Sequence, residues 1–200
     1  MHSETPQLAL WRSDFGRAYT ERNDHEKPAR VEAWRRLLDG ITPVRALEVG
    51  CNVGWNLTYL DRLGVAELYG VEPQRGAVIR ARTRDPRFNV VHGTAFALPF
   101  RDGWCDLVFT SGVLIHLAPA SLPAALDEMY RVSSRFLVAI EYDGEVEQEL
   151  PYRGHAGALW KRDHGRAWQA RHPGLRLVRR LELGAEQGYD DCTAHLFEKL

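Results

Sequence analysis

Short apolar runs alternate with amphipathic segments along most of the chain. A continuous apolar run favours a strand buried on both faces, whereas apolar residues at spacings of three and four favour a helix. Strands that alternate with helices are typical of βαβ units and a parallel sheet. The pattern predicts strands at residues 45–49, 68–71, 88–92, 105–109 and 135–140, with helices at residues 55–63, 75–84 and 121–132.

The first 40 residues are expected to be helical. Apolar residues recur at spacings of three and four over residues 8–23, which predicts one amphipathic helix. A second helix is expected to begin after Pro28 and to end at Gly40, because glycine is common just beyond a helix C-terminus. We therefore expect a single domain in which residues 1–40 form a helical cap and residues 41–200 form the core.

The C-terminal part is expected to complete the sheet. A helix is predicted at residues 158–171, followed by two antiparallel strands at residues 175–183 and 192–199, with Gly184 and Gly188 in the loop between them. Together with the earlier strands, these elements predict an α/β, Rossmann-like fold. Its sheet has seven mostly parallel strands, and the last strand is antiparallel.

Composition and charge limit the kinds of partner. The 200 residues are 44% hydrophobic, which allows one core and excludes a disordered chain. A net charge of −1 gives no strong attraction to nucleic acid or to an anionic membrane. Neither a signal peptide nor a run of 18 apolar residues is recognisable. We expect a cytoplasmic protein with a small-molecule partner, no nucleic acid and no membrane; the oligomeric state stays open, a homodimer included.

The cysteines give no sign of a disulfide framework or a zinc site. Cys51, Cys105 and Cys192 lie far apart in the sequence and show no C-x-x-C spacing. We expect them to be reduced, and we expect no bound metal.

The most informative motif is the glycine-rich segment Glu48–Gly54, where the first strand should lead into a helix. Glycines there allow close approach of a ligand to the backbone. The segment differs from the glycine motif of dinucleotide-binding proteins, which holds a pyrophosphate, because the acidic residue Glu48 precedes the loop. A carboxylate there would repel a phosphate and suits an ammonium group. Glu72, at the end of the second strand, is placed to accept hydrogen bonds from a ribose diol. The pattern thus indicates a nucleoside ligand without a pyrophosphate.

Residues 46–116 resemble the class I S-adenosylmethionine-dependent methyltransferases. The resemblance depends on A-L-E-V-G-C-N-V-G, V-E-P, G-T-A-x-x-L-P-F and D-L-V-F-T-S-G-V-L-I-H, in this order. Within that superfamily, W-R-S-D-F-G-x-x-Y-x-x-R-N, P-Y-R-G-H-x-x-x-L-W-K-R-D and D-D-C-T-x-x-L-F-E-K are similar to small methylases associated with pseudaminic acid biosynthesis. This second resemblance spans nearly the whole chain.

The first resemblance implies S-adenosylmethionine as cofactor and a methyltransferase fold. It places Glu48 near the methionine amino group, Glu72 at the ribose, and Thr94 and Ala95 beside the adenine. Asn52 stands where the superfamily usually has a glycine, and it could donate a hydrogen bond to the cofactor carboxylate. The expected cofactor-binding residues are Tyr19, Glu48, Gly50, Asn52, Gly54, Glu72, Pro73, Thr94, Ala95 and Ser111.

Methyl transfer mainly requires alignment of the reacting atoms, and a base is needed only if the acceptor must lose a proton. Candidate catalytic residues follow the fourth and fifth strands: His116, Glu141 and Tyr142. His116 could equally be a structural histidine that caps the turn or satisfies a buried hydrogen-bonding group in the core. A basic stretch at residues 151–180 follows an acidic one at residues 141–150. Within it, we expect a donor-rich substrate site for a carboxylate or phosphate, formed by Tyr152, Arg153, His155 and Lys161.

The predicted enzyme transfers a methyl group to an O or N atom of a small polar metabolite. Amino or acidic sugars, sugar nucleotides and natural-product intermediates are the expected acceptors. Two alternatives stay open: a cyclase or lyase that releases methylthioadenosine without an acceptor, and a non-catalytic binding partner in glycan assembly.

Overall fold

The computed structural model describes residues 4–200. Its main sheet consists of β1 (Arg45–Val49), β2 (Glu67–Glu72), β3 (Asn89–His92), β4 (Cys105–Ser111), β5 (Ser133–Glu141), β8 (Leu175–Leu183) and β9 (Cys192–Lys199). The strand order is β3-β2-β1-β4-β5-β9-β8. Strands β1 to β5 pair in parallel, and β9 runs antiparallel to both of its neighbours. The predicted Rossmann-like, seven-stranded fold is confirmed.

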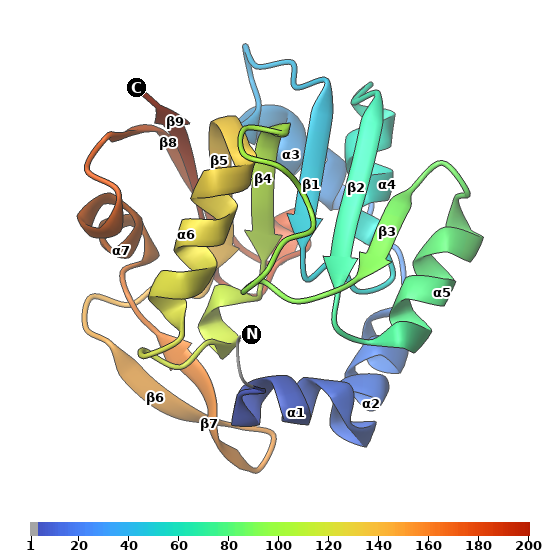
Figure 1. Ribbon diagram of the computed structural model, residues 1–200, viewed down its shortest axis with the longest axis vertical. Coiled ribbons are helices and arrows are strands. Elements are labelled where there is room, and N and C mark those ends of the chain that lie inside the picture. Colours follow the sequence, from blue (N-terminus) through green and yellow to red (C-terminus); the bar gives the residue numbers. More distant parts are fainter. Residues whose placement is uncertain (1–3) are drawn as a thin grey trace.

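Helices cover both faces of this sheet (Figure 1). The helices are α1 (Pro6–Arg12), α2 (Asp14–Asn23), α3 (Ala29–Leu37), α4 (Trp55–Arg62), α5 (Arg75–Arg84), α6 (Leu122–Val132) and α7 (His164–Arg171), with 3-10 turns η1 (Leu114–His116) and η2 (Ala185–Gln187). Successive strand residues point to opposite faces. Ala46 therefore packs in a core with α3, α4 and α5, whereas Leu47 packs in a second core with α6 and α7.

The N-terminal helical segment is divided at Ser13, contrary to the prediction of one continuous helix. Ser13 has an extended backbone, and its hydroxyl accepts a hydrogen bond from the amide of Phe15 at 3.2 Å. Serine favours this capping position because its side chain satisfies an amide that has no partner inside the helix. The break turns α2 away from α1, and the two helices lie together below the main sheet (Figure 1).

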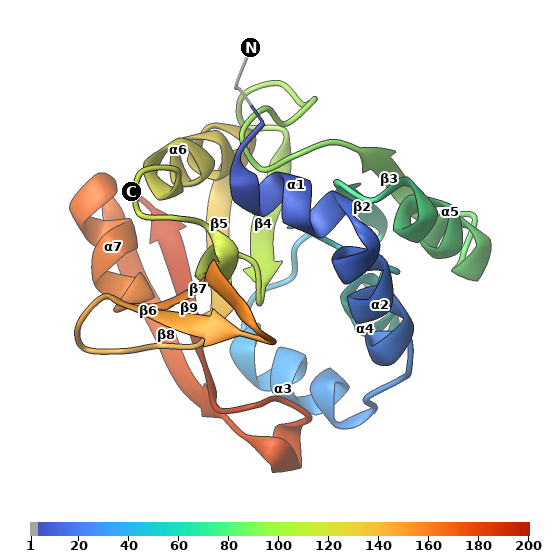
Figure 2. The same cartoon turned by 90° about the horizontal axis from the view of Figure 1, so that it is seen from below.

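A hairpin outside the main sheet replaces the beginning of the helix predicted at residues 158–171. Strands β6 (Gln148–Tyr152) and β7 (His155–Lys161) pair antiparallel, and α7 starts only after Asp163, whose carboxylate caps it. The apolar residues at the end of β7 have a spacing that fits a helix or a strand, which explains the error. The hairpin contacts α1 through Gln7, whose amide donates to the carbonyl oxygen of Gly157 at 3.0 Å. Seen from below, α1, α2 and the hairpin surround the carboxyl ends of the central strands (Figure 2).

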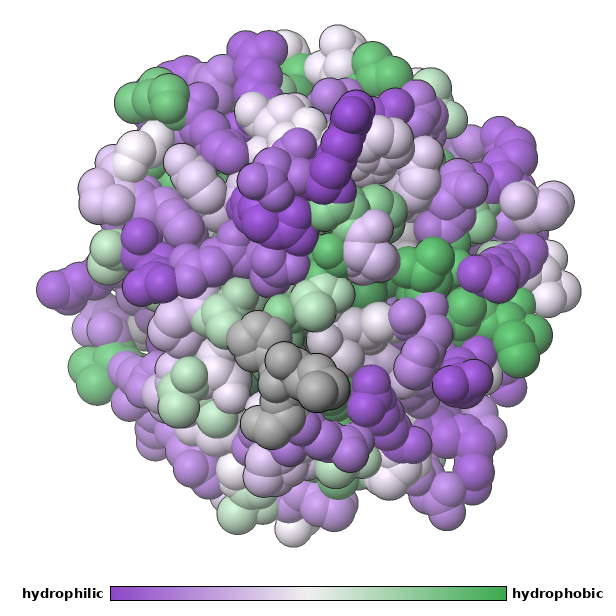
Figure 3. Space-filling model, viewed as in Figure 1, coloured by the Kyte–Doolittle hydropathy of each residue, from purple (hydrophilic) through white to green (hydrophobic). Residues whose placement is uncertain are grey.

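Hydrophilic side chains cover most of the face that Figure 3 shows. Hydrophobic residues gather near the centre of that face and towards α5. Within residues 4–200, no helix is both long enough and apolar enough to cross a membrane.

Candidate functional site

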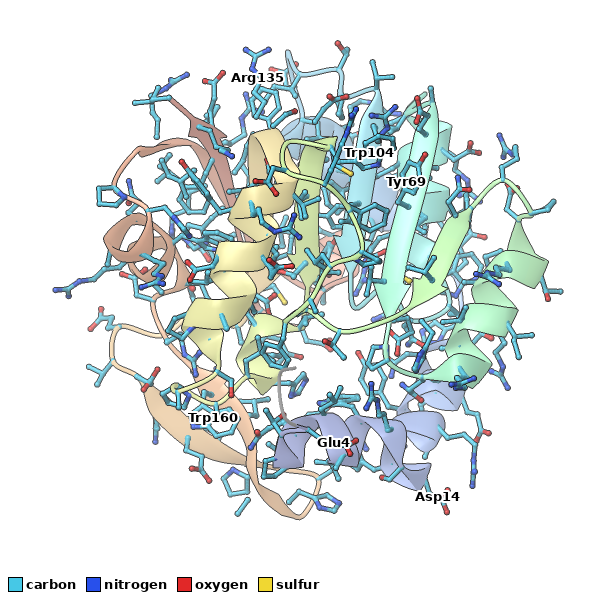
Figure 4. The ribbon with its side chains drawn as sticks, viewed as in Figure 1. Glu4, Asp14, Tyr69, Trp104, Arg135 and Trp160 are labelled. Carbon is cyan, nitrogen blue, oxygen red and sulfur yellow. The ribbon has the colours of Figure 1, made fainter. Side chains whose placement is uncertain are left out.

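A pocket opens where the parallel strands end. The arrowheads of β1, β2 and β4 point towards α1 and α2 (Figure 1), and the turns that follow these strands line the pocket together with residues of the N-terminal helices. Helices α1 and α2 and the β6–β7 hairpin cover this end of the sheet; Glu4 lies beside α1 and Trp160 lies on β7 (Figure 4). Tyr69 and Trp104 lie towards the opposite end of the sheet. The carboxyl edge of a parallel sheet is the usual place for a ligand in this class of fold.

Glu48 is a buried carboxylate with one oxygen unused. Its side chain lies on β1, and the residue is 2% exposed. Oε1 accepts a hydrogen bond from the amide of Asn56 at 2.6 Å, while Oε2 is buried and finds no partner among residues 4–200. Burial raises the pKa of Glu48 to about 8. Because an unpaired buried carboxylate is costly, a cationic ligand fits this position.

Glu72 is held by two backbone amides at the end of β2. Its Oε2 accepts from the amide of Asn52, and its Oε1 accepts from the amide of Gln74, both at 2.9 Å. Burial raises the pKa of Glu72 to about 7. Each oxygen retains a second lone pair, so the carboxylate can accept from two neighbouring hydroxyl groups.

The glycine-rich turn brings two strand ends close together. Gly50 has φ +77°, and a Cβ there would lie 2.5 Å from Cγ2 of Val113 in the turn after β4. Asn52 also adopts a left-handed conformation, with φ 47°, and its Oδ1 accepts from the hydroxyl of Thr20 at 2.8 Å. The turn is thereby connected to α2. Gly54 caps the start of α4 with φ 81° and, unlike Gly50 and Asn52, does not line the pocket of the described chain.

The other residues expected at the cofactor are brought together. Tyr19, Pro73, Thr94, Ala95 and Ser111 all line the same pocket as Glu48 and Glu72. Burial raises the pKa of Tyr19 to about 12, so its phenol stays protonated at neutral pH.

His116 lines this pocket from η1 and is 6% exposed. Its Nδ1 lies 2.6 Å from the carbonyl oxygen of Ala158 on β7. A carbonyl oxygen can only accept, so Nδ1 carries the proton and Nε2 carries the lone pair. Burial lowers the pKa of His116 to about 4, which keeps the ring neutral. The rings of Trp11 and Tyr152 pack against it at centroid distances of 4.6 and 5.1 Å.

Glu141 lies behind η1 and does not line the pocket of the described chain. It is fully buried, and its two carboxylate oxygens accept from the amides of Val113 and Ile115 at 3.2 and 3.3 Å. Burial raises its pKa to about 7. These contacts position the turn that carries His116. The ring of Tyr142 lies outside the described pocket lining too, with the Lys161 ammonium 5.8 Å from its centroid.

The residues expected at the substrate lie on the hairpin, and none of the four lines the pocket within residues 4–200. Tyr152 reaches the pocket wall through its ring contact with His116, and His155 packs against Phe15 at 4.9 Å. Arg153 and His155 are exposed. The structure therefore does not assemble these side chains and Lys161 into one closed anion site.

Other pocket residues were not anticipated from the sequence. The loop between α2 and α3 contributes the cationic side chain of Lys27, α3 contributes that of Arg30, and α4 contributes the rings of Trp55 and Tyr59. The hydroxyl of Tyr59 accepts from the amide of Lys27 at 2.7 Å. The apolar spacing of Trp55 and Tyr59 predicts core packing as readily as ligand contact, which hid their role in the pocket wall.

Comparison with known proteins gives the class of the domain. Residues 47–135 match a family described as "Methyltransferase domain". These residues are similar to a methyltransferase domain and make up less than half of the chain. The matched segment contains Glu48, Glu72 and His116.

Curated relatives match only in part. An uncharacterized methyltransferase of Synechocystis (sll0829) is 34% identical over 88 residues, which are 44% of this chain and 41% of that protein. A protein-L-isoaspartate O-methyltransferase of Shewanella amazonensis is 32% identical over 111 residues, covering 54% of this chain and 49% of that protein. The chain thus spans half or less of the length of these relatives.

Solved structures share the fold along nearly the whole chain. The 1,6-didemethyltoxoflavin-N1-methyltransferase of Burkholderia thailandensis, solved with that compound and S-adenosylhomocysteine, has a TM-score of 0.76 at 14% identity and covers 100% of this chain and 91% of its own. The glycopeptide N-methyltransferase MtfA, solved with S-adenosylhomocysteine, has a TM-score of 0.67 at 14% identity, with 99% of each chain covered. The likeness in fold extends from α1 to β9, beyond the matched residues 47–135.

Proposed function

We propose that the chain is an S-adenosylmethionine-dependent methyltransferase that methylates an O or N atom of a small polar metabolite. The observation that carries the proposal is the unpaired buried Oε2 of Glu48, which shares one pocket with the doubly anchored carboxylate of Glu72. A ligand that is cationic at one end and carries a diol at the other satisfies both groups. The amino group and the ribose of S-adenosylmethionine have this chemistry.

Each end of the cofactor has its own protein partners in this proposal. Glu48 receives the ammonium group, Glu72 receives the ribose hydroxyls, and Thr94 and Ala95 border the adenine. Lys27 and Arg30, which line the same pocket, can neutralise the cofactor carboxylate. When bound, the cofactor supplies an electrophilic methyl group on a sulfonium.

Two features of the chain then act on the acceptor. The covering elements α1, α2 and the β6–β7 hairpin exclude water and orient the acceptor, and orientation is the main requirement of methyl transfer. The lone pair on Nε2 of His116 can receive a proton from an acceptor hydroxyl or ammonium.

A small acceptor is favoured by the cover over the pocket. Gln7 of α1 is hydrogen-bonded to Gly157 of the hairpin, and Phe15 of α2 packs against Tyr152 at 6.0 Å, so the two covering elements are in contact. A folded macromolecule would have to displace these contacts. The resemblance to methylases associated with pseudaminic acid biosynthesis favours an amino or acidic sugar, a sugar nucleotide or a related natural-product intermediate.

The test combines product analysis with an acceptor panel. The protein is incubated with labelled S-adenosylmethionine, alone and with amino sugars, acidic sugars and sugar nucleotides. We expect S-adenosylhomocysteine together with a methylated acceptor in at least one mixture. Release of methylthioadenosine without an acceptor would instead support a lyase or cyclase, and binding without any product would support a non-catalytic role.

A further inference from the structure

Two aspartates and a histidine meet at the base of the β6–β7 hairpin, outside the described lining of the cofactor pocket. Asp143 follows β5, Asp163 precedes α7, and His195 lies on β9. One ligand atom from each residue lies within 4.8 Å of the other two. The three residues are far apart in the sequence, so the fold alone creates the cluster.

His195 is the buried member of this cluster. The residue is 3% exposed, and its Nε2 lies 3.5 Å from Oδ2 of Asp143. Its Nδ1 is buried and has no hydrogen-bond partner in the described part of the chain. Nε2 is thus the nitrogen that faces Asp143, whereas Nδ1 lies across the ring, so Nε2 is the atom of His195 that could bind an ion at the cluster.

Each aspartate keeps one oxygen for a ligand. Oδ1 of Asp163 accepts from the amide of Arg166 at 2.7 Å and thereby caps α7. Oδ1 of Asp143 accepts from the amide of His164 at 3.2 Å. In both residues, Oδ2 does not take part in these backbone contacts.

The local charge also favours a cation. The guanidinium of Arg180 approaches Oδ2 of Asp143 only to 3.9 Å, its side chain is about half exposed, and it pairs more closely with Glu182. The two carboxylates therefore face only the exposed side chains of Arg180 and Arg166, which also line the hollow at this cluster. A divalent ion would balance them more directly.

Gly165 leaves room for such an ion. A Cβ at this position would lie 2.8 Å from Nε2 of His195 and 3.3 Å from Oδ1 of Asp163. A surface hollow is bounded by Gly165, Asp163, His195 and Arg180. A side chain at position 165 would fill the space between the ligand atoms and this hollow.

We propose that Asp143, Asp163 and His195 bind a divalent transition-metal ion such as Zn²⁺, Co²⁺ or Mn²⁺. Two carboxylate oxygens and one imidazole nitrogen suit these ions better than Mg²⁺. Metal–ligand bonds of about 2.0–2.2 Å place neighbouring ligand atoms roughly 3–3.5 Å apart, so small side-chain rotations are sufficient to close the site.

The ion would have a structural effect on the cover of the pocket. Asp143 and Asp163 flank the two strands of the hairpin, and His195 belongs to the main sheet. The ion would therefore join both ends of the hairpin to the sheet. Because the hairpin carries Ala158, whose carbonyl oxygen orients His116, metal binding would stabilise that arrangement.

Metal titration tests the site directly. Protein treated with a chelator is titrated with Zn²⁺ and Co²⁺ in competition with a chromophoric chelator, with Mg²⁺ for comparison. We expect one ion per chain, and at least about tenfold weaker binding by Asp163→Asn and Asp143→Asn. The Asp163→Asn substitution retains a side-chain oxygen that can cap α7. Glu182→Gln is the matched control, because it removes a neighbouring negative charge outside the ligand set and should bind Zn²⁺ like the wild type.

Hydrogen exchange gives a second readout. Zn²⁺ should slow exchange in residues 148–161 of the wild type and leave the Asp163→Asn variant unchanged. Equal Zn²⁺ affinity in the wild type and both aspartate variants would overturn the proposal, because the ion would then bind elsewhere. Absence of one-to-one binding of both Zn²⁺ and Co²⁺ to the wild type would overturn it as well.

Discussion

The carbonyl oxygen of Ala158, on the hairpin, accepts a hydrogen bond from Nδ1 of His116 at 2.6 Å. This contact joins a covering element to the turn after β4, and it fixes which imidazole nitrogen carries the proton. The basic nitrogen of His116 is therefore Nε2. The position of the hairpin over the pocket therefore determines the orientation of the His116 ring.

A His116→Gln variant tests the role of this imidazole. If the acceptor must lose a proton, we expect kcat to fall by about 10²- to 10⁴-fold, because a positioned base contributes roughly that much. Affinity for S-adenosylhomocysteine should stay within about threefold of the wild type. Turnover and calorimetric affinity, measured on one preparation, check both statements. An unchanged kcat would show that His116 only packs in the pocket wall and does not accept a proton from the acceptor.

The acid limb of the rate profile gives an independent test of the same residue. Burial lowers the pKa of His116 to about 4, so its base form persists down to that pH. At saturating cofactor, we expect the acid limb that depends on His116 to lie nearer pH 4 than pH 6.5. An acid limb near pH 6.5 that disappears in His116→Gln would contradict the buried, neutral state of the ring.

Cofactor binding should depend on pH through Glu48. Its pKa of about 8 in the free protein means that the carboxyl is mostly protonated at pH 7. An ammonium ligand favours the carboxylate, so binding releases a proton below pH 8. Affinity for S-adenosylhomocysteine should therefore rise with pH from 6 to 8 and then level off. Calorimetry in buffers of different ionisation enthalpy measures the proton release. Proton uptake on binding would contradict the account.

The close approach at Gly50 predicts a sharp effect of a single methyl group. In Gly50→Ala, the new Cβ would meet Cγ2 of Val113 at 2.5 Å in a left-handed conformation. We expect a loss of about 1–3 kcal/mol of stability, together with weakened cofactor binding. Gly64→Ala is a matched control, because Gly64 has φ +86° but nothing within 4 Å of a Cβ. It should lose less stability and bind normally. Equal behaviour of both variants in thermal unfolding and calorimetry would exclude the proposed clash.

The sequence predicts the βαβ core well because buried parallel strands are continuous apolar runs and their loops carry recognisable chemistry. Glu48 and Glu72 stand out for this reason. The sequence pattern does not predict the β6–β7 hairpin, because β6 is largely exposed and lacks an apolar pattern. The break at Ser13 depends on the capping hydroxyl of that single residue. The burial of Glu141 depends on how the end of β5 packs against the turn that follows β4. The hairpin and the burial of Glu141 follow from tertiary contacts, which no local pattern records.

The proposed contact between Glu72 and the ribose predicts that replacing Glu72 weakens cofactor binding. In Glu72→Ala, the amides of Asn52 and Gln74 lose their acceptor, and the diol loses its partner. Affinity for S-adenosylhomocysteine should fall by at least about tenfold, because hydrogen bonds to a charged group contribute roughly 1.5–3 kcal/mol. Adenosine, which has the diol but lacks the amino acid end, should lose affinity in parallel. Adenosine binding that is indifferent to Glu72→Ala would place the ribose elsewhere.

The most direct measurement is calorimetric titration of wild type and Glu48→Gln with S-adenosylhomocysteine at pH 8. The substitution keeps the volume of the side chain and removes the charge that the ammonium group requires. The account predicts one-to-one binding by the wild type and at least about tenfold weaker binding by Glu48→Gln, with an unchanged unfolding temperature or a higher one. Equal affinity of the two proteins, or no binding by a folded wild type, would contradict it.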